Sequence, residues 1–121
     1  MLLHTGIDLL EIHRMQSAQQ RFGMRFLERV FTPGEITEVG NNTASLAARF
    51  AAKEAVAKAL GTGIGIVSWQ EIEILRSPAR EPVLHLHGVA LRLARELGLT
   101  TWSLSLSHSQ SHAIAVVVAI G

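Results

Sequence analysis

Three charged side chains from distant parts of the sequence stand out by type and spacing: Asp8, Glu54 and Lys58. Lysine occurs at only two positions, and Lys58 follows Glu54 by four residues. That spacing places both side chains on one face of a helix, together with the small residues Ala47 and Ala51. The pair is either a surface salt bridge, worth about a few tenths of a kcal/mol, or part of a ligand site with room beside it.

Asp8 is the only aspartate in the chain, and it interrupts an apolar segment. A carboxylate in a strand is costly to bury unless a positive group satisfies it, so Asp8 lies either at a water-facing edge or beside a cation. If Asp8 and Glu54 converge, their oxygen atoms suit Mg²⁺, which keeps water ligands and takes others from substrate phosphates. Lys58 would then contact the same phosphate.

Two other patterns have plainer interpretations. The glycine-rich segment 61–65 follows a predicted helix, whereas a phosphate-binding P-loop precedes its helix, so a helix C-cap and turn is the alternative to a ligand-binding loop. His108 and His112 lie in extended segments about 13 Å apart, too far to share one zinc ion.

The elements that must position these residues follow from apolar periodicity and capping residues. Asn41, Asn42 and Thr43 offer N-caps for an alanine-rich helix that ends before Gly61. The order of elements favours an α+β fold, with a small antiparallel sheet and a long central helix packed on it. The predicted strands are 2–12, 67–75, 83–87, 102–107 and 113–120, and the predicted helices are 14–29, a short one after Thr32, 44–60 and 89–97.

Composition limits the class of protein. A chain of 121 residues with 48% hydrophobic residues fits a single domain, 1–121, and no apolar run reaches the about 18 to 20 residues of a membrane span. The net charge of +1 argues against nucleic-acid binding. Cysteine is absent and the first residues lack a basic leader, which together favour a cytoplasmic protein without disulfides.

Three motifs give a more specific indication. Gly6-Ile7-Asp8, the run RFAAKEAVAKALGTGIG over residues 49–65, and Ser105-Leu106-Ser107-His108 closely resemble the holo-acyl-carrier-protein synthase family of 4'-phosphopantetheinyl transferases, in its small trimeric bacterial type. The resemblance implies the 4'-phosphopantetheinyl transferase-like fold. It also implies that the protein is a transferase of lipid metabolism. A serine of apo acyl carrier protein would attack the β-phosphate of coenzyme A, and 3',5'-ADP would leave.

The resemblance also assigns roles to residues. Asp8 and Glu54 would hold Mg²⁺, Lys58 would position the phosphate, and Glu54 would take the serine proton directly or through water. The nucleotide of coenzyme A would contact Arg49, Lys58, Gly61, Thr62, Gly63 and His108. For Arg49 the alternative is a solvated arginine, and for His108 a structural histidine. Gly40, Asn41 and Asn42 stand where family members often carry basic residues for the 3'-phosphate.

Partners follow from the same resemblance. Arg14, Arg21 and Arg25 would dock the acidic recognition helix of the carrier, unless they form an ordinary solvated face. The family's small members are homotrimers with active sites between subunits. The carrier stays open between fatty-acid, polyketide and other kinds. Two competing hypotheses remain: a binding module that does not turn over, and a structural oligomer in which Glu54 and Lys58 merely pair.

Overall fold

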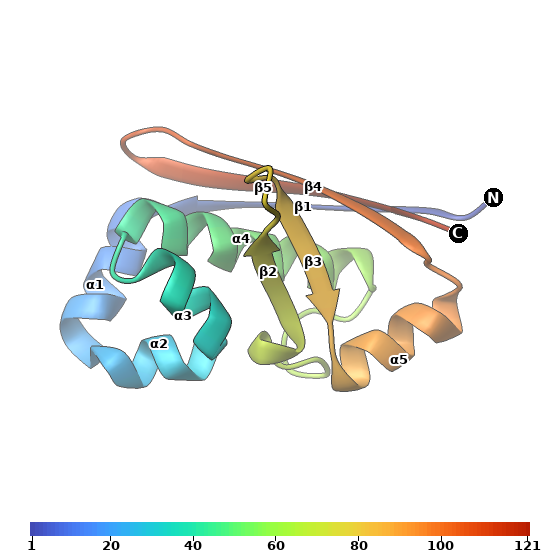
Figure 1. The fold of residues 1–121 in the computed structure, drawn as a ribbon, viewed down its shortest axis with the longest axis horizontal. Coiled ribbons are helices and arrows are strands. Elements are labelled where there is room, and N and C mark those ends of the chain that lie inside the picture. The colour runs from blue at the N-terminus through green and yellow to red at the C-terminus, as the bar shows by residue number, and fades with distance from the viewer.

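The computed structural model describes residues 1–121 as a three-stranded sheet covered on one face by all the helices. Figure 1 shows the long strands above and α1 to α5 below, with the β2–β3 hairpin between the two groups of helices. The elements are β1 (Leu3–Glu11), α1 (Ile12–Phe22), α2 (Met24–Val30), α3 (Pro33–Val39), α4 (Thr43–Ala59), a 3₁₀ turn (Trp69–Glu71), β2 (Ile72–Arg76), β3 (Pro82–Leu86), α5 (Gly88–Leu97), β4 (Thr101–His108) and β5 (His112–Ile120). This arrangement confirms the predicted α+β class.

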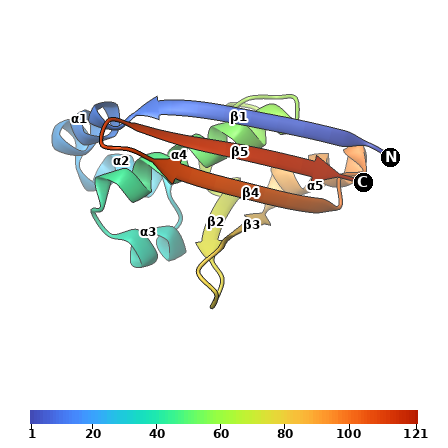
Figure 2. The same ribbon diagram turned by 90° about the horizontal axis from the view of Figure 1, so that it is seen from above.

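The main sheet is antiparallel, with strand order β1-β5-β4. Asp8 pairs with Ala115 and Leu106 pairs with the same Ala115 from the other side. Side chains alternate between the faces, so the alanines of β5 are buried against α4 while Leu3, Ile7 and Leu9 are exposed. Figure 2 looks onto this uncovered face, where the three strands lie side by side.

The long helix α4 lies directly beneath β1 and β5. Its N-cap is Asn42, whose side chain accepts a hydrogen bond from the Ser45 amide at 3.0 Å. The helix approaches the sheet closely because its buried face is mostly alanine and because β1 carries Gly6. A Cβ placed on Gly6 would lie 1.9 Å from the Ala55 carbonyl oxygen. Gly6 therefore fixes the distance between β1 and α4.

The predicted single helix over residues 14–29 was wrong. The chain forms α1 and α2, separated by Gly23 at φ 59°, a left-handed conformation that a continuous helix cannot contain. Met15 is buried as its spacing indicated, but Phe22 is 54% exposed and Met24 50% exposed. The break turns part of the apolar stripe outward.

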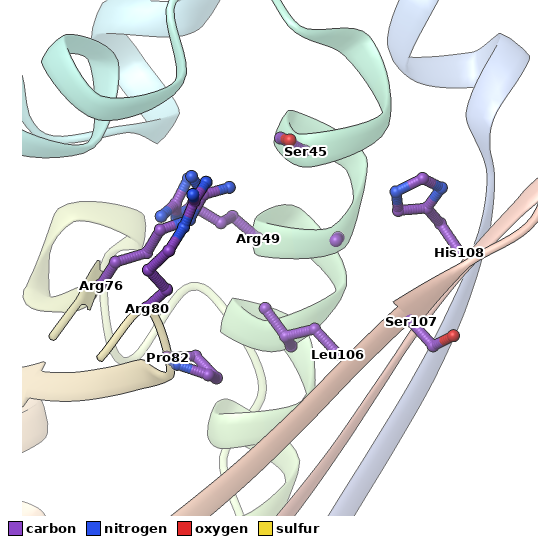
Figure 3. A pocket seen from close by; sticks show the side chains of 9 residues that line it. Ser45, Arg49, Arg76, Arg80, Pro82, Leu106, Ser107 and His108 are labelled. Atoms are coloured by element: carbon purple, nitrogen blue, oxygen red, sulfur yellow. The ribbon is translucent and has the colours of Figure 1, made fainter. Parts of the chain in front are cut away.

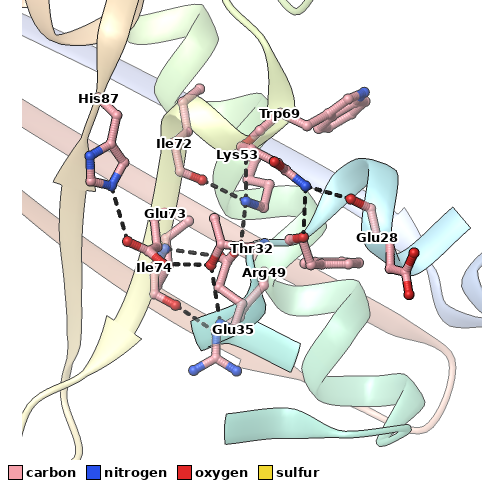
Figure 4. Close-up of polar contacts among 12 residues, drawn as sticks. Glu28, Thr32, Glu35, Arg49, Lys53, Trp69, Ile72, Glu73, Ile74 and His87 are labelled. Atoms are coloured by element: carbon pink, nitrogen blue, oxygen red, sulfur yellow. Dashed lines mark hydrogen bonds and ion pairs between the residues drawn. The ribbon is translucent and has the colours of Figure 1, made fainter. Parts of the chain in front are cut away.

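A buried ion pair joins α3, α4 and β2 (Figure 4). Glu35 is the N3 residue of a capping box with Thr32. The same carboxylate accepts a hydrogen bond from Lys53, with 2.7 Å between Lys53 Nζ and Glu35 Oε1. Lys53 also donates to the carbonyls of Trp69 and Ile72. Burial lowers the pKa of Lys53, and the neighbouring Glu35 opposes that shift. Sequence periodicity did not reveal this pair.

The β2–β3 hairpin is a separate two-stranded sheet with its own register, Ile72 opposite Leu86. Its first strand begins at Ile72 instead of the predicted residue 67, because Trp69–Glu71 forms a 3₁₀ turn. The turn of the hairpin holds Arg80 at φ 70°, the only non-glycine residue of the chain with positive φ.

None of the helices combines the length and apolar content that a bilayer crossing requires.

Candidate active site

Asp8 and Lys58 meet at the contact between β1 and α4. The Lys58 Nζ lies 3.0 Å from Asp8 Oδ1 and donates a second hydrogen bond, 2.9 Å long, to the Ile7 carbonyl. The Asp8 side chain is 20% exposed and that of Lys58 is 52% exposed. Asp8 is thus in a strand at the edge of the sheet, but its side chain faces α4, on the same side of β1 as Gly6.

Glu54 lies one helical turn before Lys58 and is half-buried. Burial raises the pKa of the Glu54 carboxyl, the negative charge of Asp8 raises it further, and Lys58 opposes both effects. The structure therefore places two carboxylates and one ammonium group within electrostatic reach of each other.

This group of residues suits a hard divalent cation. Asp8 and Glu54 repel each other when both are ionised, and a cation between them would remove that repulsion. The protein has no cluster of three or more His, Asp or Glu side chains suited to hold a metal. Two carboxylates alone leave coordination positions for water and phosphate oxygen, which is the ligand set that Mg²⁺ prefers.

The glycine-rich segment after α4 closes the helix. The amides of Gly61, Thr62 and Gly63 donate to the carbonyls of Lys58 and Ala57, at 2.9 to 3.3 Å. Gly61 and Gly63 have φ values of 79° and 76°, as a left-handed C-terminal turn requires. These three amides are engaged with the helix, so any contact of this loop with a nucleotide has to come from other atoms.

A cleft of about 220 Å³ brings Arg49 and His108 together (Figure 3). It runs between α4, the β2–β3 hairpin and the end of β4. The side chain of Arg49 is 4% exposed, so the alternative of a solvated arginine is wrong. Its Nε donates to the Ile74 carbonyl at 3.0 Å, and its Nη2 lies 3.6 Å from Glu38 Oε1. The residues that line the cleft are Ser45, Ala48, Arg49, Arg76, Arg80, Pro82, Leu106, Ser107 and His108.

Arg76 and Arg80 line this cleft and were missed in the sequence. Arg76 ends β2 and Arg80 lies in the hairpin turn, and both are exposed. The sequence identifies the segment Ser-Pro-Ala-Arg-Glu-Pro as a turn, but the positive φ of Arg80 is known only from the structure.

The candidate residues form two groups on different faces of α4. Glu54 and Lys58 face β1, whereas Arg49 contacts β2. Five residues of an α-helix correspond to a rotation of about 140° between Arg49 and Glu54. One chain therefore does not bring the arginine cleft and the carboxylate group to the same point.

The arginines near the N-terminus do not line the arginine cleft. Arg21 and Arg25 border a groove of about 610 Å³ with Phe22, Phe26 and Arg29. The guanidinium carbon of Arg21 lies 5.3 Å from the centroid of the Phe22 ring. Arg14 is exposed on α1 but does not line this groove.

Comparison with known proteins identifies the family. A model described as the 4'-phosphopantetheinyl transferase superfamily matches residues 4–117. The chain is 50% identical to a holo-[acyl-carrier-protein] synthase of Herpetosiphon aurantiacus, over 99% of this chain and 100% of the relative. It is also 50% identical to one of Dehalococcoides mccartyi, over 98% of each chain.

Solved structures agree with this result. A holo-[acyl-carrier-protein] synthase of Helicobacter pylori, crystallised with coenzyme A, superposes with a TM-score of 0.88 at 38% identity, over 96% of this chain and 99% of that one. The protein of the same description from Neisseria meningitidis gives a TM-score of 0.89 at 36% identity, over 98% of both chains. The chain therefore belongs to the 4'-phosphopantetheinyl transferase superfamily and is an enzyme of the holo-[acyl-carrier-protein] synthase type, as its sequence motifs predicted.

Proposed function

We propose that this protein transfers the 4'-phosphopantetheine group of coenzyme A to a serine of apo acyl carrier protein in a Mg²⁺-dependent reaction that releases 3',5'-ADP. The observation that carries the proposal is the meeting of Asp8, Glu54 and Lys58 between β1 and α4. The names of the relatives and the coenzyme A bound to the Helicobacter pylori protein support the same substrates.

The residues of the carboxylate group have separate roles in this proposal. Asp8 and Glu54 hold Mg²⁺, which when bound neutralises charge on the diphosphate of coenzyme A. Lys58 holds a phosphate oxygen through its ammonium group. Burial and the charge of Asp8 raise the pKa of the Glu54 carboxyl, which makes its carboxylate a stronger base than that of an exposed glutamate.

The chemistry is one displacement at phosphorus. The serine oxygen forms a bond to the β-phosphorus of coenzyme A while the bond from that phosphorus to the 3',5'-ADP oxygen breaks. The serine proton passes to Glu54, and 3',5'-ADP leaves with the electron pair of the broken bond. Lys58 reduces the negative charge that builds up on the phosphate oxygens.

The nucleotide portion of coenzyme A occupies the cleft of Arg49 and His108, with Arg49 on the 3'-phosphate. The loop of Gly61, Thr62 and Gly63 follows the other end of α4 and does not line this cleft. Because this cleft and the carboxylate group lie on different faces of α4, we propose that one subunit supplies the carboxylates and its neighbour supplies the arginine cleft. The exposed apolar face of β1 and β5, which includes Ile7, Leu9 and Val116, is the surface that a homotrimer would bury.

The acyl carrier protein docks on the α1–α2 segment in this proposal. Arg21 and Arg25 supply positive charge for an acidic helix, and the exposed Phe22 between them supplies an apolar contact. Arg14 extends the basic surface along α1. Replacement of Arg14 and Arg21 by glutamate should raise the KM for the carrier and leave that for coenzyme A unchanged; an unchanged carrier KM would refute this docking surface.

In this proposal the protein acts as a single domain in the cytoplasm.

The decisive test is incubation with apo acyl carrier protein, coenzyme A and Mg²⁺, followed by intact mass measurement of the carrier. We expect a gain of one phosphopantetheine in the wild type and none in Glu54→Gln. A folded wild-type protein that leaves the carrier mass unchanged would contradict the proposal.

A further inference from the structure

We propose that Arg80, with Arg76 beside it, is a nucleotide-binding residue that completes a three-arginine site for the 3'-phosphate of coenzyme A. The β2–β3 hairpin supplies two of the three positive charges, Arg76 at the end of β2 and Arg80 in the turn. This inference rests on the proposed function and adds residues to its nucleotide site.

Positive charge converges in the cleft with little to balance it. Figure 3 shows the guanidinium groups of Arg49, Arg76 and Arg80 gathered at one side of the cleft. Arg49 has one ion-pair partner, Glu38, at 3.6 Å, and neither Arg76 nor Arg80 has any. Three like charges with one carboxylate between them repel one another, so an anion of two charges would stabilise the cluster.

An unpaired buried donor points to the same ligand. The Nη1 atom of Arg49 is the one buried side-chain polar atom in the protein without a hydrogen-bond partner. Buried donors are nearly always paired, because an unpaired one costs about 1 to 3 kcal/mol. A phosphate oxygen in the cleft would give this atom the partner that the protein itself does not supply.

The backbone at Arg80 gives an independent reason. A φ of 70° favours glycine, and an arginine there carries backbone strain. Strained positions persist where the side chain has a use, and the side chain of Arg80 extends into the cleft. Segment 40–42 has no charged residue, although it directly precedes the helix that carries Ser45 and Arg49 into this cleft. The hairpin is therefore the available source of added positive charge.

The 3'-phosphate fits this site better than the diphosphate does. The diphosphate must reach Asp8, Glu54 and Lys58, which lie on the other face of α4 from Arg49. The second phosphate of coenzyme A is a monoester that carries close to two negative charges, and planar guanidinium groups bind such an anion through paired hydrogen bonds.

The experiment compares two substrates in the wild type and two variants. Arg80→Gly should raise the KM for coenzyme A about tenfold, the effect of losing one charge-assisted hydrogen bond, and leave the KM for 3'-dephospho-coenzyme A unchanged. Its melting temperature should equal or exceed that of the wild type, because glycine accepts the positive φ. Arg92→Ala removes the same charge from an exposed position on α5 outside the cleft and should change neither KM.

Binding without turnover gives a second measurement. Calorimetry should show that Arg80→Gly weakens binding of 3',5'-ADP and leaves binding of 5'-AMP unchanged. Equal loss for both nucleotides, or loss for neither, would overturn the assignment of Arg80 to the 3'-phosphate. If the wild type transfers no phosphopantetheine from either substrate, the proposed function itself fails, and the calorimetry still decides whether the cleft binds a 3'-phosphate.

Discussion

The close contact between β1 and α4 makes Gly6→Ala a direct test of how the candidate active site is positioned. A Cβ at residue 6 would lie 1.9 Å from the Ala55 carbonyl oxygen, whereas real Cβ atoms keep at least 3.0 Å, so strand and helix must separate by about 1.1 Å. Asp8 lies on the same side of β1, two residues later, and moves with the strand. Its 3.0 Å contact with Lys58 then breaks or lengthens.

Two magnitudes follow from this displacement. Overpacking of a tight contact costs about 1 to 3 kcal/mol of unfolding free energy. A shift of about 1 Å in a catalytic group reduces turnover by about 100-fold, so we expect kcat to fall by this factor while the KM for the carrier stays unchanged. The carrier mass assay, run below the melting temperature of the variant and corrected for its folded fraction, measures the effect.

A matched substitution separates positioning from a general effect of added bulk. In Gly34→Ala the new Cβ would lie 3.2 Å from the Glu73 carboxylate, which has to move by only a few tenths of an ångström, and alanine favours the helix, so activity should stay close to wild type. A folded Gly6→Ala protein with wild-type kcat would refute the argument that this glycine sets the position of Asp8.

Two predictions concern stability. Lys53→Met leaves Glu35 buried without its cation and should lower the free energy of unfolding, measured in urea, by about 3 to 5 kcal/mol. The double variant Lys53→Met with Glu35→Gln should recover part of that loss. Equal stability of Lys53→Met and wild type would refute the role of the pair. Burial raises the pKa of Glu73, but hydrogen bonds from Thr32 and His87 outweigh it and hold that pKa below its ordinary value of 4.5. A depressed pKa stabilises the folded protein above pH 4.5, and this contribution is lost as the pH falls through the folded value. Glu73→Gln should therefore be less stable than wild type at neutral pH, with a difference that shrinks in acid; a difference independent of pH would contradict this.

Elements with local signals were predictable from the sequence. The helix expected over 44–60 is α4 at Thr43–Ala59, because the Asn42 cap and the following Gly61 are encoded beside it. The capping box of Thr32 and Glu35 is local in the same way. Gly23 was not recognised as a helix break, because an isolated glycine is tolerated inside a helical pattern and its φ cannot be read from periodicity.

The parts of the candidate site that depend on distant contacts were harder to predict. Arg49 in an alanine-rich helix fits a solvated position equally well, and its buried position depends on contacts with the Ile74 carbonyl, 25 residues away, and with Glu38 of another helix. Lys53 is similar, since its partner Glu35 comes from another helix. Asp8, Glu54 and Lys58 stood out by type and spacing, but only the family motifs favoured their convergence, because motifs record a three-dimensional arrangement that spacing alone does not specify.

The separate β2–β3 sheet has a consequence for how the protein loses activity. A two-stranded sheet on its own is marginally stable, and this one depends on its contacts with the helices: the hydrogen bonds of Glu35, Arg49 and Lys53 and the packing of Ile72 and Ile74 in the core. Its amides should exchange with deuterium before those of β5, through a local opening that leaves the rest folded. Mild warming would then release the hairpin arginines first, and the nucleotide would slow that exchange by holding the hairpin in place.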